Sequence, residues 1–102
     1  MELEKENLLK SVIRDIPDFP VEGILFRDLT TAFKNPDALR IMSEELKKLY
    51  ADKGITKVVG IESRGFIAGA ILAHDLNAGF VPVRKPGKLP ADTIKQSYTK
   101  EY

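Results

Sequence analysis

The chain has 102 residues, of which 43% are apolar, and its 16 basic and 15 acidic residues leave a net charge of +1. This length suits one domain, and the balanced charge does not indicate binding to nucleic acid or to a membrane surface. With no cysteine and one histidine, the sequence excludes disulfides, thiolate zinc sites, cysteine nucleophiles and His-cluster metal sites. No apolar run reaches the ~18 residues of a membrane span, and the acidic N-terminus is unlike a signal peptide. We therefore expect a soluble, intracellular globular domain.

The first predicted element is an amphipathic helix of about three turns that ends before Pro17. The apolar residues with the i, i+3, i+4, i+7 spacing are Leu9, Val12, Ile13 and Ile16. Residues 17–23 contain two prolines and a glycine, and they are predicted to form an irregular loop. The short apolar run at 24–26 then predicts a strand or an extended segment.

A second helix is predicted to begin at Asn35-Pro36-Asp37. Asn35 can cap the helix, Pro36 suits its first position, and Asp37 complements its positive end. Gly54 should stop the chain from continuing as a helix. The side chains expected to be buried along this helix are Leu39, Met42, Leu46, Leu49 and Tyr50.

The second half of the chain predicts a strand, a helix and a further strand in succession. Residues 55–61 form a nearly continuous apolar stretch, which is typical of a parallel strand covered on both faces. Residues 66–76 are apolar almost all round and predict a closely packed helix, and residues 80–83 predict the next strand. Together these elements predict a βαβ unit. Because so few strands are available to flank residues 58–61, we expect the chain to be the first part of a larger α/β domain.

The hexapeptide Gly-Ile-Glu-Ser-Arg-Gly at 60–65 lies where the first of these strands passes into the helix. Ligands of open α/β sheets bind at the carboxyl ends of strands, and helix N-termini favour anions. A P-loop is rejected, because Phe66 and Ile67 stand where Lys and Ser or Thr are required. The turn is therefore either a phosphate site or a structural turn that places Arg64 in a surface ion pair.

A cluster of positive charge follows the second strand. Arg84, Lys85 and Lys88 fall within five residues, and residues 84–102 hold five basic residues against two acidic ones. The two parallel strands should end on the same side, which brings this cluster towards Arg64. Several cations at one place suit a diphosphate better than a neutral ligand. A solvated basic tail is the alternative.

With these segments in view, the sequence strongly resembles the adenine phosphoribosyltransferases, which are type I phosphoribosyltransferases. The blocks that carry the likeness are Ile-Pro-Asp-Phe-Pro at 16–20, Gly-Ile-Leu-Phe-Arg-Asp at 23–28, Gly-Ile-Glu-Ser-Arg-Gly-Phe at 60–66 and Val-Arg-Lys-Pro-Gly-Lys-Leu-Pro at 83–90, with Ser97-Tyr98 and Glu101-Tyr102. The resemblance implies an α/β fold with a parallel sheet flanked by helices. It also implies cytoplasmic purine salvage by a homodimer, which joins adenine to phosphoribosyl diphosphate with magnesium assistance and releases AMP and diphosphate. Neither nucleic acid nor a membrane is an expected partner.

The resemblance also implies roles for particular residues. The adenine site would be formed by Ile24, Leu25, Phe26 and Arg27, with Phe26 stacked on the purine and the backbone around Leu25 and Arg27 reading its edge. The diphosphate site would include Glu62, Ser63, Arg64, Arg84, Lys85 and Lys88. Arg84 would reach into the site of the partner subunit. Glu101 and Tyr102 would belong to a mobile catalytic loop that closes over the substrates and excludes water. Magnesium would be bound through phosphoribosyl diphosphate, with no metal ligand from this chain.

One motif of the family is missing. No pair of adjacent acids followed by a Thr/Gly-rich phosphate loop occurs in the 102 residues. We therefore expect an apparently truncated, N-terminal portion of the enzyme that is inactive alone. Within one domain, 1–102, it should comprise an N-terminal helix and base-binding segment (1–33), an αβαβ core (34–85) and a mobile loop (86–102). The alternatives are a non-catalytic module that binds anions or nucleotides, and a phosphoribosyltransferase for another purine.

Overall fold

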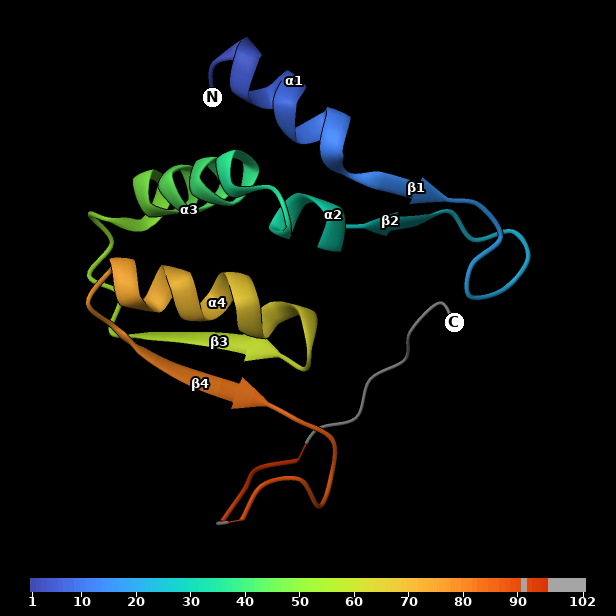
Figure 1. Ribbon diagram of the computed structural model, residues 1–102. Helices are drawn as coiled ribbons and strands as arrows, with labels where there is room; N and C mark the ends of the chain where they lie inside the picture. Colours follow the sequence, from blue (N-terminus) through green and yellow to red (C-terminus); the bar gives the residue numbers. More distant parts are fainter. Residues whose placement is uncertain (91, 96–102) are drawn as a thin grey trace. The chain divides into compact units, whose positions relative to one another are not determined.

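The computed structural model describes residues 1–90 and 92–95 of the chain. Its helices and strands, in chain order, are α1 (Leu3–Val12), β1 (Arg14–Ile16), β2 (Phe26–Asp28), α2 (Thr30–Phe33), α3 (Pro36–Tyr50), β3 (Lys57–Ile61), α4 (Arg64–Asp75) and β4 (Gly79–Val83) (Figure 1). Two compact units divide these elements: an N-terminal unit over Met1–Met42 and a second unit that begins at Ser43. Among the described residues, no helix has the length and apolar character needed to cross a membrane. The predicted boundaries at 33 and 85 stay predictions.

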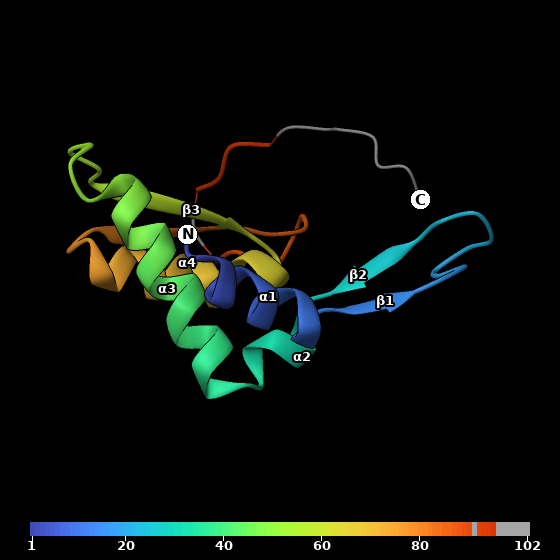
Figure 2. The ribbon, with the colours of Figure 1, turned by 90° about the horizontal axis from the view of Figure 1, so that it is seen from above.

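The N-terminal unit begins with α1, which is followed by an antiparallel ribbon of two short strands (Figure 2). The expectation that the first helix continues to Ile16 is wrong, because the helix ends at Val12 and Ile13 has extended backbone. Residues 14–16 instead pair with β2, with Arg14 opposite Asp28 and Ile16 opposite Phe26. Ladder hydrogen bonds and the pairing of opposite charges therefore outweigh a helical spacing of apolar residues.

The loop between these two strands is irregular, as predicted. The backbone of Asp18 has φ 54°, and its side-chain carboxylate accepts a hydrogen bond of 3.0 Å from the N–H of Gly23. The N–H of Phe19 donates to the carbonyl of Ile24 at 3.2 Å. An Asp side chain that closes its own turn is a usual partner for a left-handed backbone. The loop thereby brings the chain back to start β2 at Phe26, slightly later than the expected strand.

Helix α3 begins as the sequence predicts. The side-chain oxygen of Asn35 accepts hydrogen bonds from the N–H groups of Asp37 and Ala38, at 3.0 and 3.1 Å. The expected burial of Leu49 and Tyr50 is wrong, since Leu49 is 62% exposed and Tyr50 is also exposed. The residues that are buried or half-buried along the helix are Ala38, Leu39, Ile41, Met42, Ser43, Glu45 and Leu46. These positions share one side of the helix, and Leu49 continues that side into the last turn, where it is exposed.

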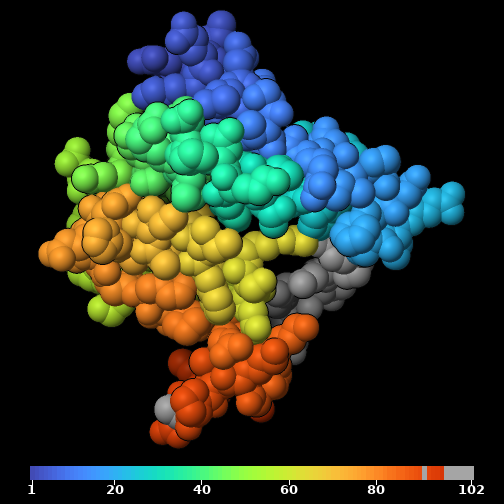
Figure 3. All heavy atoms as spheres, in the orientation of Figure 1, coloured from blue at the N-terminus to red at the C-terminus, as the bar shows by residue number. Residues whose placement is uncertain are grey.

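The second unit contains the predicted βαβ arrangement. Strands β3 and β4 are parallel, with Lys57 opposite Gly79 and Ile61 opposite Val83. Helix α4 lies along one face of this pair (Figure 1) and contacts both strands. In the space-filling view the gold and orange atoms of α4 and β4 form one continuous surface (Figure 3). The predicted helix and both strands of this unit are therefore confirmed.

The other face of this strand pair is open in the part of the chain that the structure describes. Its side chains are Val59, Ile61, Val81 and Val83, all of them exposed, with Val59 at 60%. The expected coverage of β3 on both faces is therefore wrong for the described residues. Alternation along a strand sends every second side chain to the opposite face, so α4 can cover only one set.

Candidate functional site

The turn between β3 and α4 is unusually tight, and its two glycines explain how it forms. A Cβ atom on Gly60 would lie 2.5 Å from the carbonyl oxygen of Gly65 and 2.6 Å from the ring of Phe80. A Cβ on Gly65 would lie 3.3 Å from the backbone of Gly60. The two glycines, five positions apart, therefore allow the end of β3 and the start of α4 to approach each other closely. This structural reason for the glycines agrees with the rejection of a P-loop.

Between these glycines, the turn presents polar groups at the start of α4. Ser63 precedes the helix without capping it through its side chain, and Arg64 is the first helical residue. Both residues are exposed. A helix N-terminus with an exposed hydroxyl and an exposed guanidinium can bind an anion.

A second turn follows β4 and folds the basic segment back on itself. The N–H of Lys88 donates to the carbonyl of Lys85 at 3.3 Å, and Gly87 between them has φ 84°. Pro86 and Gly87 are the residues that a type II turn prefers at its two central positions. The guanidinium of Arg84 closes the same loop by donating to the carbonyl of Lys88 at 3.1 Å.

Glu62 is the point at which the two turns meet. Its carboxylate accepts a hydrogen bond from the guanidinium of Arg84 at 3.4 Å and from the N–H of Lys85 at 3.3 Å. The ammonium of Lys88 lies 3.7 Å from the same carboxylate. The hydrogen bond from Arg84, then that from the Lys85 N–H, and the charges of Arg84 and Lys88 lower the pKa of Glu62 below its ordinary value. We call Glu62, Arg84, Lys85 and Lys88 the Glu62 cluster.

Next to this cluster, the loop after β4 surrounds a hollow of about 320 Å³. Its lining residues are Val83, Arg84, Lys85, Pro86, Gly87, Leu89, Thr93, Ile94 and Lys95. Two of its three cations, Arg84 and Lys85, directly follow β4, and the third is Lys95. Arg84, Lys85 and Lys88 gather around Glu62, and the predicted approach of this cluster to Arg64 stays a prediction. The reach of Arg84 into a partner subunit stays a prediction, since Arg84 here contacts Glu62 of its own chain.

The predicted base-binding segment lies in the N-terminal unit. Phe26 is half-buried and meets Phe19 edge to face, with ring centroids 5.1 Å apart. Leu25 and Arg27 are exposed, and the guanidinium of Arg27 lies 3.6 Å from the carboxylate of Asp15. Edge-to-face pairs of this kind are a usual arrangement of two aromatic rings in a protein.

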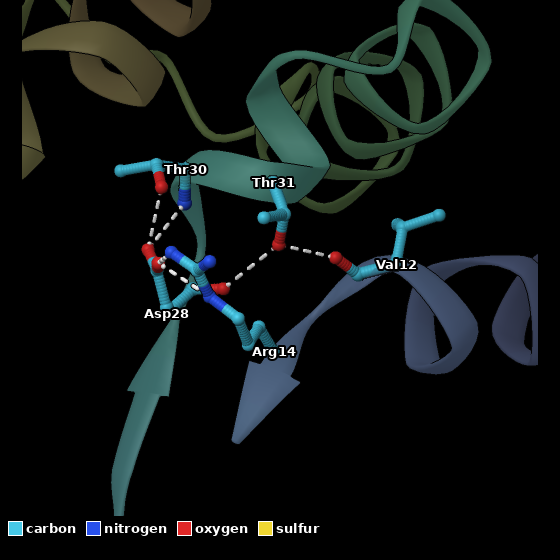
Figure 4. Close-up of polar contacts among 5 residues, drawn as sticks. All are labelled: Val12, Arg14, Asp28, Thr30 and Thr31. Carbon is cyan, nitrogen blue, oxygen red and sulfur yellow. Dashed lines mark hydrogen bonds and ion pairs between the residues drawn. The ribbon is translucent and has the colours of Figure 1, made fainter. Parts of the chain in front are cut away.

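A polar cluster that the sequence reasoning missed holds the end of this segment (Figure 4). Asp28 is 7% exposed and accepts hydrogen bonds from the N–H and the hydroxyl of Thr30, at 2.9 and 2.7 Å. It also pairs with the guanidinium of Arg14, whose Nε lies 3.2 Å away. The Thr31 hydroxyl contacts the carbonyl of Val12 and, at 3.3 Å, that of Asp28.

These contacts lower the pKa of Asp28 from its ordinary 3.8 to about 2, with the hydrogen bond from the Thr30 hydroxyl as the largest cause and that from Arg14 next. One local signal for this cluster exists in the sequence. An Asp followed two residues later by a Thr favours a side-chain-to-backbone turn. The two predicted catalytic residues, Glu101 and Tyr102, lie outside the described residues.

Comparison with known proteins gives a consistent assignment. The chain is 65% identical, over all of its 102 residues, to an adenine phosphoribosyltransferase of Bacteroides thetaiotaomicron, and it spans 57% of that protein's length. The enzyme from Giardia lamblia in complex with 9-deazaadenine has a TM-score of 0.88 and 50% identity, over 92% of this chain and 52% of that one.

The enzyme from Saccharomyces cerevisiae, in complex with adenine and an imino-altritol bisphosphate, has a TM-score of 0.86 and 41% identity. That match covers 99% of this chain and 60% of the yeast chain. No family model matches the chain. By sequence over its whole length and by its type I phosphoribosyltransferase fold, the chain is therefore a relative of the adenine phosphoribosyltransferases, and it spans a little more than half the length of these relatives.

Proposed function

We propose that this chain belongs to a purine-salvage enzyme that joins adenine to phosphoribosyl diphosphate and releases AMP and diphosphate. The observation that carries the proposal is the gathering of Arg84, Lys85 and Lys88 at the carboxyl ends of β3 and β4. The relatives of the chain are named adenine phosphoribosyltransferase. Those names favour adenine over another purine, and a transferase over a non-catalytic module.

In the proposed reaction, the second unit binds the diphosphate of the substrate. The helix start at Ser63 and Arg64, together with Arg84 and Lys88, supplies positive charge where negative charge builds on the departing diphosphate. Hydrogen-bond donors and charges that are already in place when the bond breaks stabilise the transition state without further rearrangement. Arginine suits the diphosphate oxygens as a bidentate donor, and lysine acts as a point charge.

The N-terminal unit is proposed to bind the purine. Phe26 would stack on the base, and the backbone around Leu25 and Arg27 would read its edge. The antiparallel pairing of β1 with β2 supports this role, because it fixes the backbone of Phe26 and Arg27. Glu101 and Tyr102 are proposed to close over the substrates as part of a catalytic loop.

We further propose a cytoplasmic homodimer and a magnesium ion that arrives bound to phosphoribosyl diphosphate. The described residues contain no group of three His, Asp or Glu side chains that could hold a metal. The carboxylate of Glu62 is already engaged by cations. These residues therefore do not fit a protein-held metal site, and no step of the reaction is assigned to the ion.

The experiment is an assay of the full-length gene product with phosphoribosyl diphosphate and each of adenine, hypoxanthine and guanine. We expect AMP formation, with kcat/KM for adenine more than about tenfold above that for the other bases, because unpaired polar groups in a base site penalise the wrong base. The 102-residue chain alone is the control, and it should not form AMP. Equal rates for the three bases, or no transfer to any of them, would contradict the proposal.

A further inference from the structure

The carboxylate of Glu62 lies among the cations that are proposed to bind diphosphate, although it carries the same sign of charge as that ligand. It touches both turns of the site, since it follows β3 directly and accepts from Arg84 and from the N–H of Lys85. Lys88 lies within ion-pair distance of it. A residue in this position cannot attract a diphosphate, so its contacts with the cations call for another explanation.

The contacts of Glu62 are long. Its distances to Arg84, Lys85 and Lys88 are 3.4, 3.3 and 3.7 Å, whereas charge-assisted hydrogen bonds usually measure about 2.7–2.9 Å. Its side chain is 20% exposed, and those of Arg84 and Lys88 are more exposed still. Partly solvated ion pairs at these distances are weak and can be exchanged for stronger ones.

We propose that Glu62 is an internal counter-ion: its carboxylate occupies the cation cluster while the diphosphate site is empty and leaves the cluster when diphosphate binds. The proposal rests on the proposed function, because it assigns diphosphate to this site. In the empty site, Glu62 keeps Arg84 and the turn at residues 85–88 beside the start of α4. A diphosphate carries several negative charges and can replace a single carboxylate on the same donors.

The matched test compares Glu62→Gln with the unchanged full-length protein by calorimetric titration with inorganic diphosphate. Gln keeps a carbonyl that can accept from the Lys85 N–H but removes the competing charge. We expect diphosphate to bind about three- to fivefold more tightly, which is the upper end of what loss of a weak competing ion pair allows. Glu4→Gln makes the same change of charge at an exposed position of α1 and should leave the affinity within about twofold.

A second measurement uses the unchanged protein and does not depend on the folding of a variant. With carbon-13 at the glutamate carboxyl groups, NMR follows the pKa of Glu62 with and without saturating diphosphate. The pKa should rise from its lowered value once the donors are taken by the ligand. Equal or weaker diphosphate binding by a folded Glu62→Gln protein, or a pKa that stays low in the complex, would overturn the proposal.

The assay with adenine separates this inference from the proposed function. If diphosphate binds more tightly to Glu62→Gln but no AMP forms from adenine, the counter-ion role stands and the proposed function fails. If AMP forms but Glu62→Gln leaves the diphosphate affinity unchanged, the counter-ion role alone fails. If neither protein binds diphosphate, the counter-ion role is overturned.

Discussion

Each of the two units holds a carboxylate against an arginine, and the two arrangements differ in how tightly they are made. Asp28 is buried, and it accepts from Thr30 at 2.7 and 2.9 Å in addition to its pair with Arg14. Glu62 is partly exposed, and its contacts measure 3.3–3.7 Å. Two of the hydrogen bonds to Asp28 come from Thr30, only two positions away, so these two donors are in place as soon as the local chain folds.

This difference indicates that the two carboxylate–arginine pairs have different roles. A carboxylate that is buried and fully hydrogen-bonded fixes the backbone around it, and here it fixes the end of β2 next to the proposed base-binding residues. A carboxylate that meets exposed cations at long distance can give them up to a ligand. We therefore expect substitutions at the first site to affect stability and those at the second to affect anion binding.

The largest expected effect separates the two substrates. In the full-length protein, Arg64→Ala should weaken phosphoribosyl diphosphate binding much more than adenine binding, because Arg64 is the first residue of α4 and a helix N-terminus favours anions. Phe26→Ala should do the reverse and raise the KM for adenine by about 5- to 150-fold, since stacking on a base contributes ~1–3 kcal/mol. Steady-state kinetics with each substrate varied in turn measures both. Equal losses for both substrates in Arg64→Ala would assign the turn a structural role only.

The next effect concerns Asp28 with its hydrogen bonds to Thr30 and Arg14, which we call the anchor. Asp28→Asn keeps the size of the side chain but removes the charge that Arg14 and Thr30 contact. We expect the melting temperature to fall by about 3–8 °C, because a buried group loses charge-assisted hydrogen bonds. Glu62→Gln should lower it by less than about 2 °C, as is usual for a partly exposed pair. Differential scanning calorimetry on both variants measures this contrast, and equal shifts would remove the distinction between anchor and exchangeable pair.

A pH series should show a smaller effect with a defined sign. Folding lowers the pKa of Asp28 from 3.8 to about 2, so between these values the unfolded chain binds more protons than the folded one. The stability that this carboxylate contributes is therefore present above about pH 4 and is lost as the pH falls towards 2. The difference in melting temperature between the natural protein and Asp28→Asn should shrink over this window. A difference that stays constant from pH 5 to pH 2.5 would show that the charge of Asp28 does not matter.

These expectations depend on features that the sequence reveals unequally. Local patterns predicted the Asn35 cap, the turn between Gly60 and Gly65 and the βαβ unit, because each is decided within a few residues. The pairing of Arg14 with Asp28 joins positions 14 residues apart, and no local pattern indicates it. For that reason a helical spacing of apolar residues led to a wrong helix where β1 lies.

In the candidate site, too, the local features could be predicted from the sequence and the contacts between distant residues could not. Spacing alone predicted that cations would gather after β4, because parallel strands end on the same side. The use of Glu62 as their counter-ion depends on the turn at residues 85–88 bringing Lys88 back towards β3. Such a contact follows from the geometry of two loops together, so residue types and spacing suggested a binding residue but not its function.

The smallest expected effect comes from the ion pair next to the anchor on the same strand pair. Asp15 lies opposite Arg27, one position along from the pairing of Arg14 with Asp28, and successive side chains of a strand point to opposite faces. The guanidinium of Arg27 is 3.6 Å from Asp15, and both side chains are more than half exposed. Water and salt screen such a pair, so Asp15→Asn should change the melting temperature by less than about 2 °C. Calorimetry at low and at high salt checks this, and a loss as large as that of Asp28→Asn would show that burial is not what distinguishes the two pairs.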